Sequence, residues 1–487
     1  MSSRVLLNEK EILAVADLPP LSNETLLLLQ EVLCKLGAQF TSCSNSSSAS
    51  VFGSTTVFTS NMLSLILHHK KQWRVPSLRL YVNINLFLMI DPLLQIGAGL
   101  MASANSEESM LRGFAFGRLA IRIIETHSVS PEIACSVYNF FASHIMIWHR
   151  PLVETQRYFL AAITKGIETY DVTWTSIAVI DRAVFGLFAG ESLDLVQAKL
   201  EEAAPLIRKN KQEVGKHWLA MPMQLVRGLR GYEESNDTTG SNSPIDADNV
   251  LVQAKITQSH THLFAYHCYQ LIAAVFNGNT AQGMTAAKAC ETYLPSAKGS
   301  FLSAMYTFYA AILYAENIDA LMQNEMTLLN QKMEMLRLWT KTAPSTFEHK
   351  YKFLQVMMSK KADRNIDTLD LFDEVMYLAV ENGFIHDAAL YAERCAQWLS
   401  KFSPKRASLY LNFARRQYDF WGAGMKATEL SQLLPPSNVV RGFCLLYLKI
   451  SLTRSSPSKP NKRIRKSICE KGTRRQHPHK SSVTRFP

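Results

Sequence analysis

The chain of 487 residues is 47% hydrophobic and 19% charged, and it carries a formal net charge of +11. This length is too great for one compact core, and this apolar content excludes a disordered chain. Several domains or a solenoid of repeats are therefore expected.

The positive charge is concentrated in the last part of the sequence. Residues 451–487 hold eleven Lys or Arg and one acid, which leaves a net charge of +1 for the other 450 residues. A basic groove for nucleic acid is therefore not expected in the body of the chain. The run Lys459–Lys466 is a candidate for nuclear localisation or nucleic-acid binding. The alternative is that residues 437–487 are not genuine coding sequence.

The cysteines are scattered, at Cys34, Cys43, Cys135, Cys268, Cys290, Cys395, Cys444 and Cys469. This spacing argues against a zinc ribbon and a disulfide framework, and it fits reduced thiols. A cytoplasmic location is expected, with a nuclear one as the alternative if the basic tail is genuine. No signal peptide is expected, because Glu9, Glu11 and Asp17 stand near the N-terminus, which lacks a basic flank followed by an apolar run.

Composition divides the chain into five expected segments. They are an irregular N-terminal segment with a Ser-rich linker at 1–70, an N-terminal helical-repeat region at 71–231, a flexible insertion at 232–249, a C-terminal helical-repeat region at 250–436 and a basic, disordered tail at 437–487. The most apolar stretch, Leu80–Met101, is interrupted by polar residues and by Pro92. It is interpreted as buried helix and turn rather than as a membrane span.

Helical periodicity dominates from Trp73 onward. The predicted helices before residue 361 are Leu111–Thr126, Pro131–Trp148, Pro151–Tyr170, Val172–Phe188, Leu193–Lys209, Val214–Leu229, Val252–Phe276, Thr280–Tyr293, Lys298–Glu316, Ala320–Trp339 and Phe347–Lys360. The one candidate strand, Ser50–Phe58, has a poor pattern, so the predicted fold class is all-α.

The stretch from Asp367 to Leu434 predicts two successive helical hairpins. Asp367 is the expected N-cap of the first helix, and Gly383 is expected to end it in the left-handed conformation. Ser403-Pro404 supplies the N-cap and first residue of the third helix, and Gly422 ends that helix.

Alanines recur in these hairpins at a fixed distance. Ala379 and Ala414 are 35 residues apart, as are Ala388 and Ala423, which is close to the tetratricopeptide period. Small side chains let stacked helices approach closely, so a tetratricopeptide-like helical-hairpin solenoid is predicted. The residues expected to define the repeat packing are Ala379, Ala388, Ala392, Ala407, Leu411, Ala414, Tyr418, Trp421, Gly422 and Ala423.

The sequence contains no phosphate loop, no kinase HRD or DFG triplet and no GxSxG elbow. Gly97-Ala98-Gly99 follows no predicted strand and is not expected to bind a nucleotide. His260, His262 and His267 share a predicted helix, but they lack the i, i+4 spacing and the further ligands of a metal site. No catalytic, cofactor-binding or metal-binding residue is therefore predicted.

Two further patterns favour structural interpretations. The aromatic-rich helix around Phe301–Tyr314 is expected to pack between helices, with a ligand groove as the alternative. The basic pairs His349-Lys350 and Arg415-Arg416 are expected to be solvated helix surface.

A resemblance to a known family lies in three groups of residues: Trp339…Pro344…His349-Lys350, then Ala388-Ala389-Leu390…Glu393, then Tyr410-Leu411…Ala414…Tyr418…Trp421-Gly422-Ala423…Lys426. They resemble the tetratricopeptide-like region of large hybrid sensor histidine kinases, and Trp148-His149-Arg150-Pro151 looks like part of the same region. Such proteins also carry a protein-kinase-like domain, an AAA-type ATPase, a GAF domain and a histidine kinase. The resemblance covers about Leu111–Leu434 and departs from the family at Ser403-Pro404, where glycine is expected.

This resemblance implies a fragment that holds only the regulatory spacer of a kinase. The leading expectation is a non-catalytic scaffold whose partners are proteins, either peptides or neighbouring kinase and ATPase domains. One alternative is a piece of an ATP-dependent sensor histidine or serine/threonine kinase whose catalytic domains lie elsewhere. Another is a nuclear or nucleic-acid adaptor that acts through the basic tail. No cofactor and no small-molecule substrate are expected.

Overall fold

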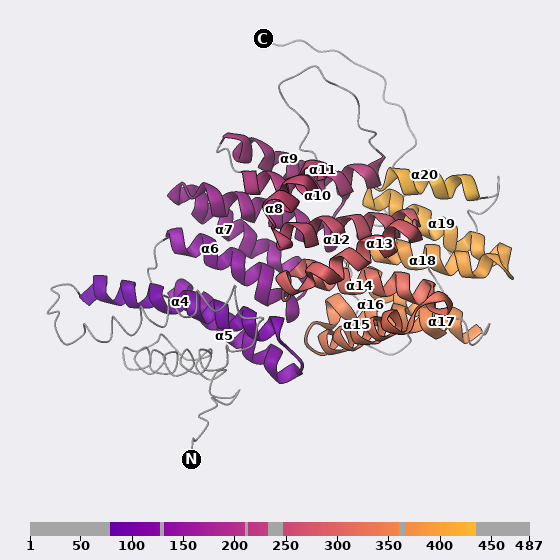
Figure 1. Ribbon diagram of the computed structural model, residues 1–487, viewed down its shortest axis with the longest axis horizontal. Coiled ribbons are helices and arrows are strands. Elements are labelled where there is room, and N and C mark those ends of the chain that lie inside the picture. The colour runs from indigo at the N-terminus through magenta and orange to yellow at the C-terminus, as the bar shows by residue number, and fades with distance from the viewer. Residues whose placement is uncertain (1–77, 127–130, 210–212, 232–246, 360–365, 435–487) are drawn as a thin grey trace, which may run out of the picture. The chain divides into compact units, whose positions relative to one another are not determined.

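The computed structural model describes residues 78–126, 131–209, 213–231, 247–359 and 366–434, which form helices joined by short turns (Figure 1). The first helices are α4 (Leu78–Ala102), α5 (Glu107–Thr126), α6 (Pro131–Phe140), α7 (Thr155–Thr169), α8 (Val172–Phe188), α9 (Leu193–Lys209) and α10 (Glu213–Arg230). The later helices are α11 (Ala247–Ile256), α12 (His260–Asn277), α13 (Thr280–Tyr293), α14 (Phe301–Glu316), α15 (Gln323–Thr342), α16 (Pro344–Ser359), α17 (Ile366–Glu381), α18 (Ile385–Ser400), α19 (Pro404–Trp421) and α20 (Gly424–Leu433). Residues 1–70, most of the expected insertion and the basic tail lie outside the described ranges.

The helices follow the packing order of a helical-hairpin solenoid. Each helix from α6 to α10 packs on the next one along the chain, and so does each helix from α12 to α20. Alternate helices also touch, as α6 with α8, α8 with α10, and α12 with α14. No strand occurs in the described ranges. The prediction of an all-α, tetratricopeptide-like solenoid is therefore confirmed.

Glycines in the left-handed conformation end helices in the last two hairpins. Gly383 has φ +89° and Gly422 has φ +94°, a region that costs glycine little because it has no Cβ. The Ala423 amide then donates to Tyr418 O at 2.8 Å, as in a Schellman turn. Pro404 is the first residue of α19, as predicted. Asp367, by contrast, lies inside α17 rather than at its N-cap, because the helix begins one residue earlier, at Ile366.

Three predicted helices differ from the structure. The helix predicted at Pro131–Trp148 leaves the α-helical form at Phe141, passing through a π-helical turn (Phe141–Ile145) and a 3-10 turn (Met146–Trp148). The helix predicted at Val252–Phe276 is interrupted before His260, where Gln258 has φ +52°. The turn expected within Leu80–Met101 is absent, because α4 continues through Pro92.

The π-helical turn after α6, Phe141–Ile145, packs closely against α5. A Cβ added at Gly117 would lie 2.7 Å from Ile145 Cγ2 and 3.0 Å from Phe141 Cδ2. Gly97 on α4 and Gly113 on α5 are equally tight, since a Cβ at Gly97 would lie 2.9 Å from Gly113 O. Gly97 therefore serves helix–helix packing. Among the described helices, none is both long enough and apolar enough to cross a bilayer.

Helix α14 is buried on every side. Its residues from Ser303 to Ala315 are all buried, and Phe301 is 3% exposed. Phe301 stacks on Phe185 of α8, while Phe308 lies edge-on to Tyr391 of α18. The interpretation of this aromatic helix as an inter-helix packing element is therefore confirmed.

Helices from the first half of the described chain contact later helices directly. The ring centroid of Trp148, at the end of the 3-10 turn after α6, lies 4.9 Å from the ring centroid of Trp339 on α15. The turn after α8 approaches the turn after α17 so closely that a Cβ at Gly190 would lie 2.2 Å from Gly383 O. The chain therefore returns to its own first half, which a strictly linear array of repeats does not do.

Candidate functional site

Charged side chains lie in the interior where α16 packs on α18. His349 and Lys350 are each 1% exposed, and Asp387 is fully buried. Lys350 Nζ donates to Asp387 Oδ2, and His349 Nε2 lies 3.0 Å from the same oxygen. The expectation that His349-Lys350 is solvated surface is therefore wrong.

The helical spacing of α16 explains how Lys350 comes to be buried. Phe347, Leu354 and Met357 lie three, four and seven residues from Lys350, and all are buried. Its ammonium lies 4.9 Å from the ring centroid of Phe308 and 4.5 Å from that of Phe384, so two aromatic rings replace part of its hydration. The spacing could have revealed this position, but the residue type pointed to the surface.

The ionisation of this cluster is set by burial and by the close opposite charge. Burial raises the pKa of Asp387. The Lys350 ammonium, His386 and His349 outweigh burial and hold the pKa of Asp387 below its usual range. Burial lowers the pKa of Lys350, and the Asp387 carboxylate opposes that shift. Burial lowers the pKa of His349 to about 4 and that of His386 to about 4. At neutral pH the cluster is therefore a Lys–Asp ion pair between two neutral histidines.

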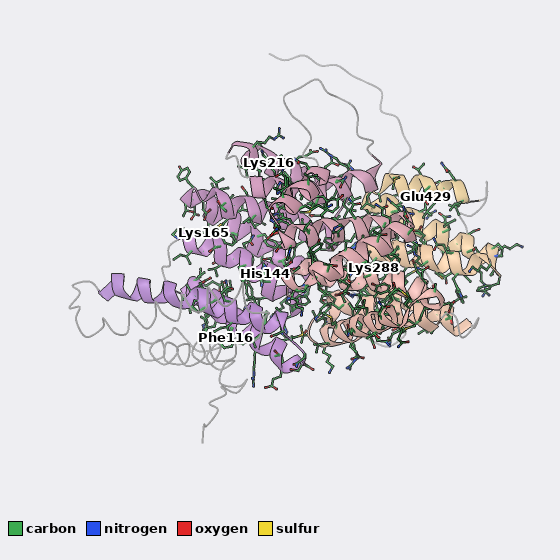
Figure 2. The ribbon with its side chains drawn as sticks, in the orientation of Figure 1. Phe116, His144, Lys165, Lys216, Lys288 and Glu429 are labelled. Atoms are coloured by element: carbon green, nitrogen blue, oxygen red, sulfur yellow. The ribbon has the colours of Figure 1, made fainter. Side chains whose placement is uncertain are left out.

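A second buried cluster joins the last three helices. Glu393 on α18 accepts a hydrogen bond from Tyr418 OH at 2.8 Å and another from Lys426 Nζ at 2.9 Å. Lys426 is 1% exposed, and it also donates to Glu429 at 2.9 Å. Glu429 is labelled on α20 in Figure 2. These bonds fix α19 and α20 to α18 through one carboxylate that is satisfied on both oxygens.

Arg394 extends this connection to the middle of the molecule. It is 4% exposed, forms an ion pair with Glu316 at the end of α14, and donates to Val275 O at 2.7 Å. Val275 belongs to the last turn of α12, where the helix dipole places partial negative charge that attracts a cation. Glu393 and Arg394 together therefore link five helices.

A third pair lies between α13 and α15. Lys332 Nζ is 2.5 Å from Glu291 Oε1 and 3.0 Å from Tyr306 OH, and the lysine is 4% exposed. Burial lowers the pKa of Lys332, and Glu291 opposes that shift. Each of the three clusters pairs its cations with carboxylates, which is the arrangement that a buried charge needs for stability. The ion pairs and hydrogen bonds of these clusters hold neighbouring helices together.

The residues expected to define the repeat packing occupy the following places. Ala379, Ala388, Ala392, Ala414, Tyr418 and Ala423 are fully buried, Trp421 is 2% exposed, Ala407 is 7% exposed, Leu411 is half-buried and Gly422 forms the turn after α19. Tyr418 is the one that also belongs to a charge cluster. The clusters themselves were not predicted as a site, although the resemblance included His349, Lys350, Glu393 and Lys426.

Two of the three histidines of α12, His260 and His267, lie against the same ring, that of Tyr293. His262 Nδ1 lies 2.7 Å from Ser259 Oγ and its ring packs on Trp218, whereas His267 stacks on Tyr293. Burial lowers the pKa of both His262 and His267. In the described parts of the chain, no three His, Cys, Asp or Glu side chains are grouped so as to hold a metal ion.

Comparison with known proteins gives one match. A sequence model of the family described as "CHK1-like, TPR repeats" matches residues 256–414, about a third of the chain. No curated protein and no solved structure matched. The matched stretch begins at the end of α11, ends within α19 and contains His349, Lys350, Asp387 and Glu393. Residues 256–414 are therefore similar to the tetratricopeptide repeats of CHK1-like proteins.

Proposed function

We propose that this chain is a non-catalytic helical-repeat scaffold, the regulatory region of a signal-transduction kinase, which makes contacts with other proteins. The match of residues 256–414 to CHK1-like tetratricopeptide repeats carries this proposal. Helical repeats of this kind bind proteins through extended helix faces. The resemblance to hybrid sensor kinases extends the proposal to neighbouring kinase or ATPase domains as partners, in the cytoplasm.

The buried clusters suit a scaffold because they hold the helices in one arrangement. Lys350, Asp387, Glu393 and Lys426 are all less than 5% exposed, so none of them is available to a substrate at the surface. A surface that binds another protein must keep its shape, and buried ion pairs with several hydrogen bonds favour one arrangement over others. The proposed contacts are made by the outer faces of helices that these clusters support.

Chemical cross-linking in cells that produce this chain tests the proposal. Lys288, Lys341 and Lys401 are exposed within the matched stretch and react with amine cross-linkers. We expect cross-links from these lysines to a protein that carries a kinase, ATPase or phosphoryl-receiver domain. Cross-links confined to proteins outside phosphoryl-transfer signalling would contradict the proposal, and Lys165 on α7 serves as the comparison outside the matched stretch.

The second candidate is that the native polypeptide is an ATP-dependent sensor kinase of which this chain is one piece. The same resemblance at Trp339, His349-Lys350 and Trp421-Gly422-Ala423 favours it. Sequencing the complete transcript through both ends distinguishes the two candidates. Coding sequence for a protein-kinase-like or histidine-kinase domain in frame with this chain supports the second candidate, and a transcript confined to residues 1–487 rejects it.

A further inference from the structure

The turn between α18 and α19 brings positive charge and an aromatic ring together at the surface. This basic turn, residues 401–406, has the sequence Lys-Phe-Ser-Pro-Lys-Arg. Lys401, Lys405 and Arg406 are exposed, and Phe402 is 41% exposed. Among the residues that the structure describes, no carboxylate pairs with any of these three cations. The basic turn therefore presents three positive charges around one exposed ring.

The exposed ring of Phe402 is supported from below by other rings. It lies edge-on to Trp398 of α18, with 4.8 Å between ring centroids. The ring centroid of Trp398 lies 6.0 Å from that of Phe372, which is fully buried in α17. The Phe402 amide also donates to Leu399 O at 3.0 Å. A ring supported in this way loses little freedom when a partner covers it, so it suits the anchor of an interface.

The charges of the basic turn determine which kind of partner fits the ring. Lys401 directly precedes Phe402. Lys405 and Arg406 lie in the first turn of α19, which starts at Pro404. A partner that covers the ring must place its own groups beside these cations, where carboxylates are attracted and further cations are repelled. The charge complement of the basic turn is therefore an acidic chain with an apolar side chain.

Carboxylates on α17 limit the size of the partner. Tyr410 lies one turn after Arg406 on the same side of α19, and its hydroxyl donates to Asp373 Oδ1 at 2.8 Å. Burial is the main cause that raises the pKa of Tyr410, and the charges of Asp373 and Asp370 add to it. A broad anionic surface, such as a membrane or a nucleic-acid duplex, would meet these carboxylates as well as the cations. A single acidic segment can contact the cations alone.

We propose that the basic turn is the docking surface for one acidic, extended segment of a partner protein. An apolar side chain of that segment lies against Phe402, and its carboxylates lie beside the three cations. This docking surface rests on the proposed function, since it requires that the chain contacts other proteins. The basic turn lies inside the stretch that matches CHK1-like tetratricopeptide repeats. The surface is small and exposed, so we expect weak binding that salt screens.

Photo-cross-linking with an acidic peptide tests this docking surface. The probe is a short synthetic peptide of Asp and Glu with one benzoylphenylalanine at its centre, mixed with the full chain. Mass spectrometry of the cross-linked chain is expected to locate the peptide on residues 398–406. The yield is expected to fall as the salt concentration rises from about 0.1 M to about 1 M. Attachment confined to the basic residues 451–487, or spread over other surfaces, would overturn the proposal.

Two matched double variants identify the charges that bind the peptide. Lys405→Glu/Arg406→Glu is expected to lower the yield at residues 398–406 about tenfold, because it places carboxylates beside the acidic peptide. Arg118→Glu/Lys288→Glu makes the same change of net charge at exposed positions on α5 and α13. We expect this control to leave the yield within about twofold of the native value, since distant exposed charges are screened. Equal yields from the two variants would overturn the proposal.

The fold of both variants is checked by thermal melting followed by circular dichroism. Carboxylates in the first turn of α19 agree with the helix dipole, so Lys405→Glu/Arg406→Glu is expected to fold. If it does not fold, Lys405→Gln/Arg406→Gln replaces it. A peptide in which Gln and Asn replace the acids is expected to attach poorly, and equal attachment of this neutral peptide would count against charge recognition.

Vesicles of phosphatidylserine and phosphatidylcholine provide the comparison with a membrane. We expect the native chain and Lys405→Glu/Arg406→Glu to co-sediment with them equally. Vesicle binding that depends on these two cations, without peptide attachment at the basic turn, would overturn the proposal.

The docking surface and the proposed function fail in different ways. If cells yield cross-links to a phosphoryl-transfer protein but the peptide does not attach at the basic turn, the docking surface alone is wrong. If the peptide attaches there but no such protein is cross-linked, the docking surface stands and the assignment to a kinase pathway is wrong.

Discussion

The helices before and after the gap at residues 232–246 stabilise their contacts in different ways. The first group, up to Gly231, relies on close backbone contacts at Gly97, Gly113 and Gly117 and on apolar packing. Its buried ion pair, Lys199 with Glu191, joins α9 to the turn before it. The second, from Ala247 onward, contains the three charge clusters. A helical stack thus becomes specific either by shape, where only glycine fits, or by ion pairs that must find their partners.

Breaking the buried Lys350–Asp387 pair is expected to cause the largest loss of unfolding free energy. Lys350→Ala leaves the Asp387 carboxylate buried without its counter-ion, which costs about 3–5 kcal/mol of unfolding free energy. The double variant Lys350→Met/Asp387→Leu removes both charges, and we expect it to recover most of that loss. Urea denaturation measures all three proteins.

The control for this pair is an exposed one. Arg337→Ala removes the contact with Glu334 on α15, and we expect a change within about 1 kcal/mol because both side chains are at least half exposed. A loss as large as that of Lys350→Ala would show that charge removal in general, rather than burial, sets the cost.

The contact between the regions gives the second largest effect. Gly190→Ala places a Cβ 2.2 Å from Gly383 O at φ +87°, so we expect a loss of about 2–4 kcal/mol from overpacking and backbone strain. Gly278 has φ +68° with nothing within 4 Å of an added Cβ. Gly278→Ala therefore costs only the strain, about 1–2 kcal/mol. Equal melting temperatures for the two variants would contradict this close approach.

Enlarging an alanine of the 35-residue register is expected to cost a comparable or smaller amount of unfolding free energy. Ala414 is fully buried in α19, and Ala414→Leu adds three carbons where α18 and α19 pack closely. We expect a loss of about 1–3 kcal/mol from overpacking, measured by chemical denaturation. The matched substitution Ala161→Leu on half-buried α7 surface is expected to be near neutral. An unchanged midpoint for Ala414→Leu would show that the 35-residue register is not a packing register.

Protonation of a single buried histidine is expected to have the smallest effect on the free energy of unfolding. The pKa of His349 and of His386 falls from 6.5 in the unfolded chain to about 4 in the folded one, so the unfolded chain binds more protons between these values. Stability therefore falls as the pH drops from 6.5 towards 4, by about 1–2 kcal/mol for each histidine at pH 5. His386→Phe should reduce this pH dependence. Denaturation at pH 7 and pH 5 provides the comparison.

Local signals were sufficient to predict much of the fold. Gly383, Gly422 and Pro404 mark helix ends because their backbone preferences act within a single turn. The interruption at Phe141 was not predicted, since apolar periodicity continues across it. The interruption at Gln258 lies in the polar run Thr257–His262, which was included in one predicted helix. Each depends on packing with a neighbouring helix or on a single residue's backbone conformation, which a periodicity window does not detect.

The clusters were beyond sequence reasoning for a different reason. Lys350 and Asp387 are 37 residues apart, and each alone resembles an ordinary surface residue. Only the fold shows that each of these two residues lies on the buried face of its helix. The contact of Gly190 with Gly383 is more distant still, and nothing local to either glycine indicates it.

The enclosure of α14 affects how the chain is made. Its covering helices α16 and α18 follow it in the sequence, with α18 ending at Ser400. During synthesis, which adds about 5–20 residues per second, the apolar surface of α14 is uncovered for several seconds after it leaves the ribosome. The face of α14 that packs on α18 therefore stays uncovered in a nascent chain until α18 has emerged.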